Sequence, residues 1–87
     1  MSSFALLVTL TVVQGHALQL DQLHEAGLIS VEASWDERTI PYVHVDDGWS
    51  TVIGVDLDTA AGSYPFDILL RYEDGRVATR TDVLFVK

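Results

Sequence analysis

The chain contains no cysteine and only two prolines among its 87 residues. Without cysteine it can form no disulfide bond and no thiolate metal site, and it has no cysteine nucleophile. The scarcity of proline excludes a proline-rich linker, and apolar residues, at 48 % of the chain, exclude an intrinsically disordered segment. The length suits one hydrophobic core, so we interpret residues 1–87 as a single domain in which residues 1–3 are start residues.

Basic residues are scarce as well. Five Lys and Arg stand against thirteen Asp and Glu, which gives a formal net charge of −8. Phosphate recognition requires clustered cations, whereas Arg71, Arg76 and Arg80 are interleaved with acidic residues, so we expect no nucleic-acid partner. We also expect no membrane insertion, because the apolar run at residues 4–13 is too short for a spanning helix. No basic residue precedes Arg38, so the cations of a signal peptide are missing.

The chain is rich in period-two alternation, which is typical of strands with one buried face. Four alternating series predict buried residues at Ile29, Val31, Ala33 and Trp35; at Trp49, Thr51, Ile53, Val55 and Leu57; at Tyr64, Phe66, Ile68, Leu70 and Tyr72; and at Val77, Thr79, Thr81, Val83 and Phe85. Turn residues separate the series. Among them, Glu73-Asp74-Gly75 predicts a hairpin with a positive φ at Gly75.

Alternation and turns together predict seven strands, at residues 4–13, 16–23, 28–35, 39–44, 49–57, 63–72 and 76–86. A helical turn within residues 20–27 is the competing prediction there. Gly62 followed by Tyr64 resembles a tyrosine corner, in which a tyrosine hydroxyl bonds to the backbone upstream. We therefore expect an all-β, immunoglobulin-like β-sandwich of about seven antiparallel strands.

No arrangement of side chains in the sequence predicts catalysis. The three histidines, His16, His24 and His44, lack the spacing of a zinc site, and no nucleophile elbow or phosphate-binding loop occurs. His44 and Asp46 would share one side of a strand, which is a weak indication of a metal or acid–base pair. The acidic turns, with Asp46, Asp47, Asp56 and Asp58, lack EF-hand spacing. We predict a domain that is not an enzyme and that needs no cofactor and no metal.

Several segments occur in an order that resembles a known module. They are Val13-Gln14-Gly15, Ala33-Ser34-Trp35-Asp36-Glu37-Arg38, Ile40-Pro41-Tyr42, Gly48-Trp49, Ile53-Gly54-Val55-Asp56-Leu57 and Ala61-Gly62-Ser63-Tyr64-Pro65. This order resembles the immunoglobulin-like domain that precedes the catalytic domain in some bacterial lysostaphin/LytM-type zinc metallopeptidases, which cut peptidoglycan cross-bridges. The chain departs from that pattern at Glu37, where glycine is usual, and at Ala61, where proline often stands. It also lacks the catalytic domain's His-x-His motif.

The resemblance implies a non-catalytic accessory module that positions or occludes a peptidoglycan-directed catalytic domain, outside the cell or in the cell envelope. Its partner would be that neighbouring domain. The alternative is a ligand-binding sandwich, such as a carbohydrate-binding module for cell-wall glycans. Exposed aromatic side chains would favour this alternative, whereas the alternation predicts that Trp35 and Trp49 are buried.

The first and last strands are apolar on both faces, which predicts an interface. If these strands lie side by side, an outward apolar strip forms from Leu7, Leu69, Leu84 and Val86. Small monomers rarely expose a large contiguous apolar patch, and long apolar edge strands pair with other chains. We expect this strip to face a neighbouring domain or to mediate self-association. The alternative is that residues 4–7 are frayed or covered by residues 20–27.

Overall fold

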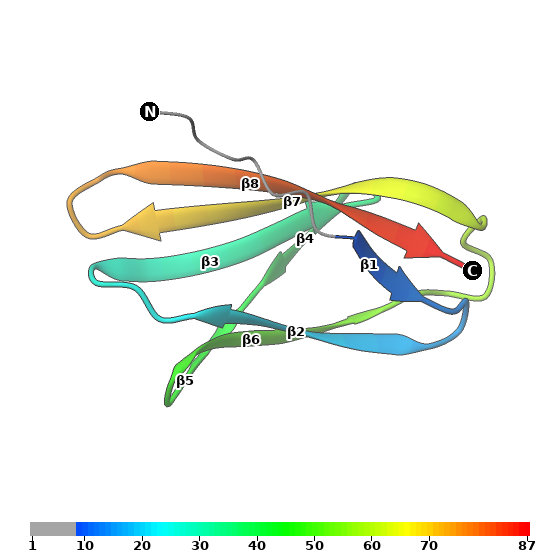
Figure 1. Cartoon of the computed structure of the whole chain (residues 1–87), viewed down its shortest axis with the longest axis horizontal. Helices are drawn as coiled ribbons and strands as arrows, with labels where there is room; N and C mark the ends of the chain where they lie inside the picture. The colour runs from blue at the N-terminus through cyan, green and yellow to red at the C-terminus, as the bar shows by residue number, and fades with distance from the viewer. Residues whose placement is uncertain (1–8) are drawn as a thin grey trace.

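The computed structural model describes residues 9–87, which form two packed β-sheets and no helix (Figure 1). Its eight strands are β1 (Thr9–Val12), β2 (Ala17–Leu23), β3 (Leu28–Trp35), β4 (Arg38–Pro41), β5 (Val43–Val45), β6 (Gly48–Gly54), β7 (Gly62–Tyr72) and β8 (Val77–Val86). One sheet has the order β1-β8-β7-β3-β4 and the other the order β2-β6-β5. Over these residues, no helix has the length and apolarity needed to cross a bilayer.

The strand order is that of an immunoglobulin-like sandwich, with β8, β7 and β3 adjacent in one sheet and β2, β6 and β5 in the other. Trp35 is buried on β3, and Tyr64 meets it edge-on near the start of β7, with ring centroids 5.7 Å apart. A buried tryptophan and a tyrosine at these two places are hallmarks of the fold. The predicted sandwich is confirmed, with eight strands instead of seven. One pairing, β1 with β8, is parallel instead of antiparallel.

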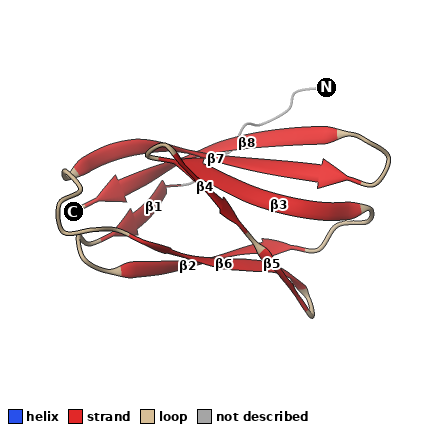
Figure 2. Cartoon of the chain, turned by 180° about the vertical axis from the view of Figure 1, so that it is seen from behind, coloured by secondary structure: helices blue, strands red, loops and turns tan. Residues whose placement is uncertain are grey.

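The strand predicted at residues 39–44 is wrong, because two strands in different sheets take its place. β4 pairs with β3 and ends at Pro41, a residue without an N–H for a sheet ladder. The chain then crosses to the other sheet, where β5 pairs with β6 (Figure 2). Tyr42 lies at this crossing and is buried between the sheets. Residues 20–23 belong to β2, so the competing helical turn is also wrong there.

Most of the predicted core is confirmed. The buried side chains include Trp35, Trp49, Ile53, Val55, Phe66, Ile68 and Leu70, with Tyr64 partly buried against them. In the first three of the four predicted series, two core residues are exposed instead. A register shift between Leu28 and Ser30 leaves Ile29 56 % exposed, and Leu57 is 76 % exposed because β6 already ends at Gly54.

The buried face predicted for the last strand is inverted. The hairpin at Gly75, whose φ is +88° as predicted, pairs Tyr64 with Leu84, so these two side chains share the inward face. Leu84 and Val86 are fully buried, and Phe85 is exposed. Leu84 and Val86 therefore cannot line an outward strip, and that part of the predicted interface is wrong. Leu69 does face outward, opposite Glu32 and Thr79, and Leu7 lies outside the described residues.

Candidate functional site

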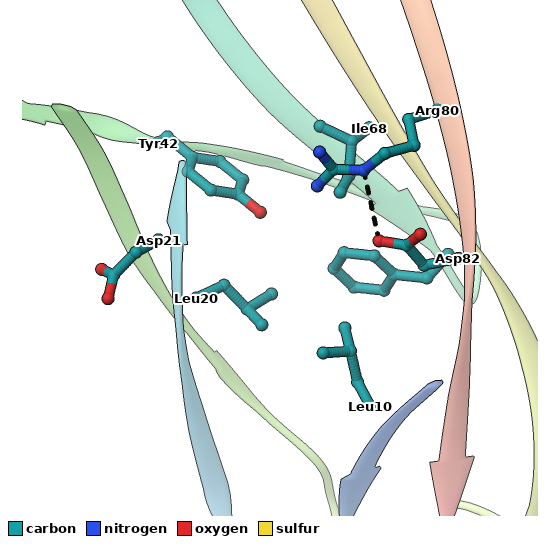
Figure 3. Close-up of a pocket in the computed structure, with 8 residues that line it drawn as sticks. Leu10, Leu20, Asp21, Tyr42, Ile68, Arg80 and Asp82 are labelled. Atoms are coloured by element: carbon teal, nitrogen blue, oxygen red, sulfur yellow. Dashed lines mark ion pairs between the residues drawn. The ribbon is translucent and has the colours of Figure 1, made fainter. Parts of the chain in front are cut away.

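The inward face of β8 carries two charged residues where the other strands carry apolar ones. Arg80 pairs with Ile68, and Asp82 pairs with Phe66, so both charged side chains point toward the space between the sheets. A cavity of about 300 Å³ lies there, between β8 and β2 (Figure 3). It is lined by Leu10, Leu20, Asp21, Tyr42, Phe66, Ile68, Arg80 and Asp82.

Asp82 is a buried carboxylate held by a partly exposed arginine. Its side chain is 3 % exposed, and its Oδ2 lies 3.4 Å from Nε of Arg80, whose side chain is 43 % exposed. The guanidinium also donates from Nη1 to Oε1 of Gln22 on β2, at 3.2 Å. Arg80 thus links the two sheets at the rim of the cavity. The ion pair offsets part of the free-energy cost of burying the carboxylate.

The second carboxylate oxygen of Asp82 has no hydrogen-bond donor among residues 9–87. Only two other buried side-chain atoms of these residues lack a partner, the indole nitrogens of Trp35 and Trp49, and neither indole lines the cavity. An unsatisfied buried acceptor costs about 1–3 kcal/mol, and more when it is charged. Folded proteins rarely leave such an atom without a protein or water partner. Asp82 thus carries one buried carboxylate oxygen without a hydrogen-bond donor in the wall of the cavity.

Tyr42 supplies a third polar group. Its hydroxyl points into the same space as the Arg80 guanidinium and the Asp82 carboxylate (Figure 3). Burial raises the pKa of Tyr42 above its ordinary value of 10.0, while the charge of Arg80 lowers that pKa and the charges of Asp82 and Asp21 raise it. The phenol is consequently neutral at physiological pH, and its hydroxyl can both donate and accept a hydrogen bond.

The raised pKa of Tyr42 predicts a loss of stability in alkaline solution. A raised folded-state pKa stabilises the fold fully below the unfolded value of about 10, and this contribution is lost as pH rises through the folded value. We expect the free energy of unfolding to fall as pH rises above about 10, the unfolded value. Tyr42→Phe should make this fall smaller. Tyr72 adds a contribution of the same sign, because its hydrogen bond to Glu25 raises its pKa. Urea denaturation over a pH series measures how steeply the free energy of unfolding falls with pH in the wild type and in Tyr42→Phe. Equal slopes in these two proteins would contradict the prediction.

The cavity combines apolar walls with a small group of polar side chains. Its walls are mostly apolar, from Leu10, Leu20, Phe66 and Ile68, and its polar groups are few and close together. Apolar walls with a few convergent polar groups are typical of small-molecule sites. Its lining includes no serine, threonine or histidine. The carboxylate, guanidinium and phenol can therefore orient a ligand by hydrogen bonds and charge.

A second candidate surface is the outer face of the three-stranded sheet. Four large apolar side chains are exposed on it: Leu23 by 79 %, Val43 by 65 %, Val45 by 45 % and Val52 by 61 %. We call these four residues the apolar sheet face. Leu23 and Val45 flank Gly48 in register, and a hollow of about 210 Å³ opens there beside Asp21 and Asp47. Exposed apolar patches on small proteins commonly mark contacts with other proteins.

The remaining residues singled out from the sequence lie apart from the cavity. Tyr64 donates from its hydroxyl to the backbone carbonyl of Ala60, four residues upstream, at 2.5 Å, the contact that a tyrosine corner requires. Gly62 opens β7 just before it. The rings of His24 and His44 lie 6.3 Å apart, which their separation in sequence did not indicate. Within the described residues, no group of three or more metal-ligating side chains occurs.

Sequence reasoning missed the cavity because it assigned the wrong face of β8 to the core. The true inward series is Ala78, Arg80, Asp82, Leu84 and Val86. It alternates as regularly as the outward series, but two of its first three residues, Arg80 and Asp82, are charged. The sequence did contain one signal that this face is buried. The last two residues of the series, Leu84 and Val86, are both apolar. The structure brings Tyr42 to the same place from the crossing between the sheets.

Compared with known proteins, the chain matches no family model, and no curated protein matches it significantly. The cavity and the apolar sheet face are therefore interpreted from their own chemistry.

Proposed function

We propose that this domain is a non-catalytic binding module and that the cavity between β2 and β8 is its ligand site. One observation carries the proposal: Asp82 is buried in a mostly apolar cavity with one carboxylate oxygen that no donor of the described chain reaches. A leucine at this position, as at Leu84, would pack the sandwich at no electrostatic cost. Positions that break the rules of core formation in an otherwise regular fold are commonly functional.

The test is a screen of small fragments by nuclear magnetic resonance on the isotope-labelled domain. We expect fragments with an apolar body and one polar head to shift the methyl signals of Leu10, Leu20 and Ile68. Leu20→Trp places a ring in the cavity and should abolish these shifts. Leu23→Trp is the matched control, because Leu23 lies on the same strand with its side chain on the exposed outer face. Fragments that bind Leu20→Trp as well as the wild type, or a screen without any binder at these methyls, would contradict the proposal.

A second candidate function is the docking of a neighbouring protein domain on the apolar sheet face. Four exposed apolar side chains support it, together with the hollow at Gly48. The acidic rim at Asp21 and Asp47 suits a partner with an apolar contact surface bordered by basic residues. The resemblance of the sequence to accessory domains of lysostaphin/LytM-type peptidases supports a catalytic zinc peptidase domain as that partner, in an exported protein of the cell envelope.

This second proposal is tested on the gene and on the protein. We expect the reading frame around these codons to encode a domain with a His-x-His motif, and that domain, produced separately, to bind the 87-residue chain. Leu23→Lys/Val45→Lys should weaken the binding, whereas Leu69→Lys, on the outer face of the other sheet, should not. A reading frame without such a domain would overturn the peptidase proposal.

A further inference from the structure

We propose that the hollow at Gly48 binds an arginine side chain of a partner protein, with the guanidinium at the carboxylates of Asp21 and Asp47. This inference rests on the second proposed function, because it names the side chain that the apolar sheet face would recognise. Three features of the hollow lead to it: its shape, its negative charge and its apolar walls.

The hollow owes its shape to Gly48. On the outer face of the three-stranded sheet, Gly48 on β6 stands in register between Leu23 on β2 and Val45 on β5. Both flanking side chains are exposed, whereas Gly48 contributes no side chain. A larger residue cannot fill the hollow, because a Cβ atom at Gly48 would collide with the backbone carbonyl of Gln22. The fold therefore keeps a recess open in an exposed apolar surface.

Two exposed carboxylates border this recess. Asp21 and Asp47 both line it, and no arginine or lysine does. Asp21 alternates with Leu23 along β2, and its carboxylate points away from the larger cavity (Figure 3). It accepts a long, exposed hydrogen bond from Nε2 of Gln19, at 3.4 Å. Neither Asp21 nor Asp47 forms an ion pair among residues 9–87, so both charges are available to a partner.

The basic residues of the chain are engaged elsewhere. Each of its four arginines forms an ion pair with an acidic residue other than Asp21 and Asp47. The only lysine, Lys87, does not line the hollow. Opposite charge on a partner steers its approach and fixes its register on a surface. The cation that complements the hollow therefore comes from a partner.

The apolar walls favour arginine over lysine as that cation. A long basic side chain can pack its stem on apolar surface while its charged head stays at a polar rim. Leu23 and Val45 offer such a surface beside the two carboxylates. A guanidinium is weakly hydrated and carries five donors in a planar fork, so it can contact carboxylates on two sides, whereas an ammonium is a compact and strongly hydrated charge. Arginine is also enriched in protein interfaces.

The experiment compares four acetyl-valyl-X-valine amides on the isotope-labelled domain, with arginine, lysine, citrulline or norleucine as X. Citrulline is the neutral isostere of arginine, and norleucine supplies the apolar stem alone. Methyl signals of Leu23 and Val45 report binding at constant ionic strength. We expect the arginine peptide to bind about threefold to tenfold more tightly than the citrulline peptide, because two exposed ion pairs form. It should also bind more tightly than the lysine and norleucine peptides.

Two double variants complete the test. Asp21→Asn/Asp47→Asn should lower the affinity for the arginine peptide to that for the citrulline peptide and leave the latter unchanged. Asp36→Asn/Asp58→Asn removes the same charge from two exposed positions that do not line the hollow, and it should change neither affinity.

The outcomes separate this inference from the docking function itself. Citrulline or lysine peptides that bind as tightly as the arginine peptide would overturn the arginine inference but leave an apolar docking surface. If no peptide shifts the two methyl signals, the arginine inference also fails, whereas docking of a whole domain is decided by the Leu23→Lys/Val45→Lys experiment above. The comparison of peptides on the wild type decides the question even if the asparagine variants do not fold.

Discussion

Replacement of Phe66 by alanine is expected to destabilise the domain by about 3–5 kcal/mol, because burial of the ring is lost and a void remains. Phe66 is fully buried at the centre of β7, and it contributes to both the core and the wall of the cavity. A small domain has only about 5–15 kcal/mol of stability to lose. Equilibrium denaturation in urea measures the change as a lower midpoint.

Phe85 on β8 is the matched control for Phe66. Its ring is 39 % exposed on the outer face of the same sheet. Phe85→Ala should therefore cost less than about 1 kcal/mol, as expected for a surface substitution that leaves no cavity. The pair also tests the orientation of β8, since the opposite orientation would bury Phe85. A larger loss for Phe85→Ala than for Phe66→Ala would contradict both assignments.

The second large effect is expected at Gly48, where β6 meets β2. A Cβ atom added there would lie 2.3 Å from the backbone carbonyl oxygen of Gln22. This oxygen belongs to a paired strand and cannot move aside as a flexible side chain would. Gly48→Ala should therefore push β2 and β6 apart at the Leu23–Gly48 pair and cost about 1–3 kcal/mol or more.

Gly54 is the control at the other end of β6. A Cβ atom built there meets no atom within 4 Å. Gly54→Ala should leave the free energy of unfolding within about 0.5 kcal/mol of the wild type. Thermal denaturation of the two variants side by side is sufficient, because they make the same chemical change on one strand. Equal melting temperatures would contradict the close contact at Gly48.

The fold was predictable from the sequence because most strands alternate cleanly and end at recognisable turns. Trp35, Ile53 and Phe66 fall in mostly apolar series whose opposite faces are more polar, so their burial follows from the period of two. The errors arise where tertiary structure interrupts the period. The register shift after Leu28 is one example, and the crossing of the chain between the sheets at Tyr42 is another. Apart from Pro41, no residue in the local sequence indicates the register shift or the crossing.

The candidate site was not predictable in the same way, because it lies where the inward face of a strand is polar. Val77 and Phe85 make the outward face of β8 look like a core face, whereas Arg80 and Asp82 make the inward face look solvated. The register of the hairpin between β7 and β8 decides which face of β8 is buried. Tyr72 points inward, so its neighbour Arg71 points outward. Val77 pairs with Arg71 across the hairpin and must therefore point outward too. Hairpin geometry outweighs composition at this strand.

The parallel pairing of β1 with β8 also determines how the domain responds to mechanical force. Thr9 lies beside Val83 and Val12 beside Val86, and the ladder continues with a bond from the Lys87 N–H to the Val12 carbonyl, at 2.9 Å. Tension on the chain before Thr9 and after Lys87 pulls these strands past each other along their length. Their hydrogen bonds are loaded together in shear instead of opening one after another. Resistance to stretching is a matter of unfolding rate, so the patch of four residue pairs between β1 and β8 sets the force at which the whole sandwich yields.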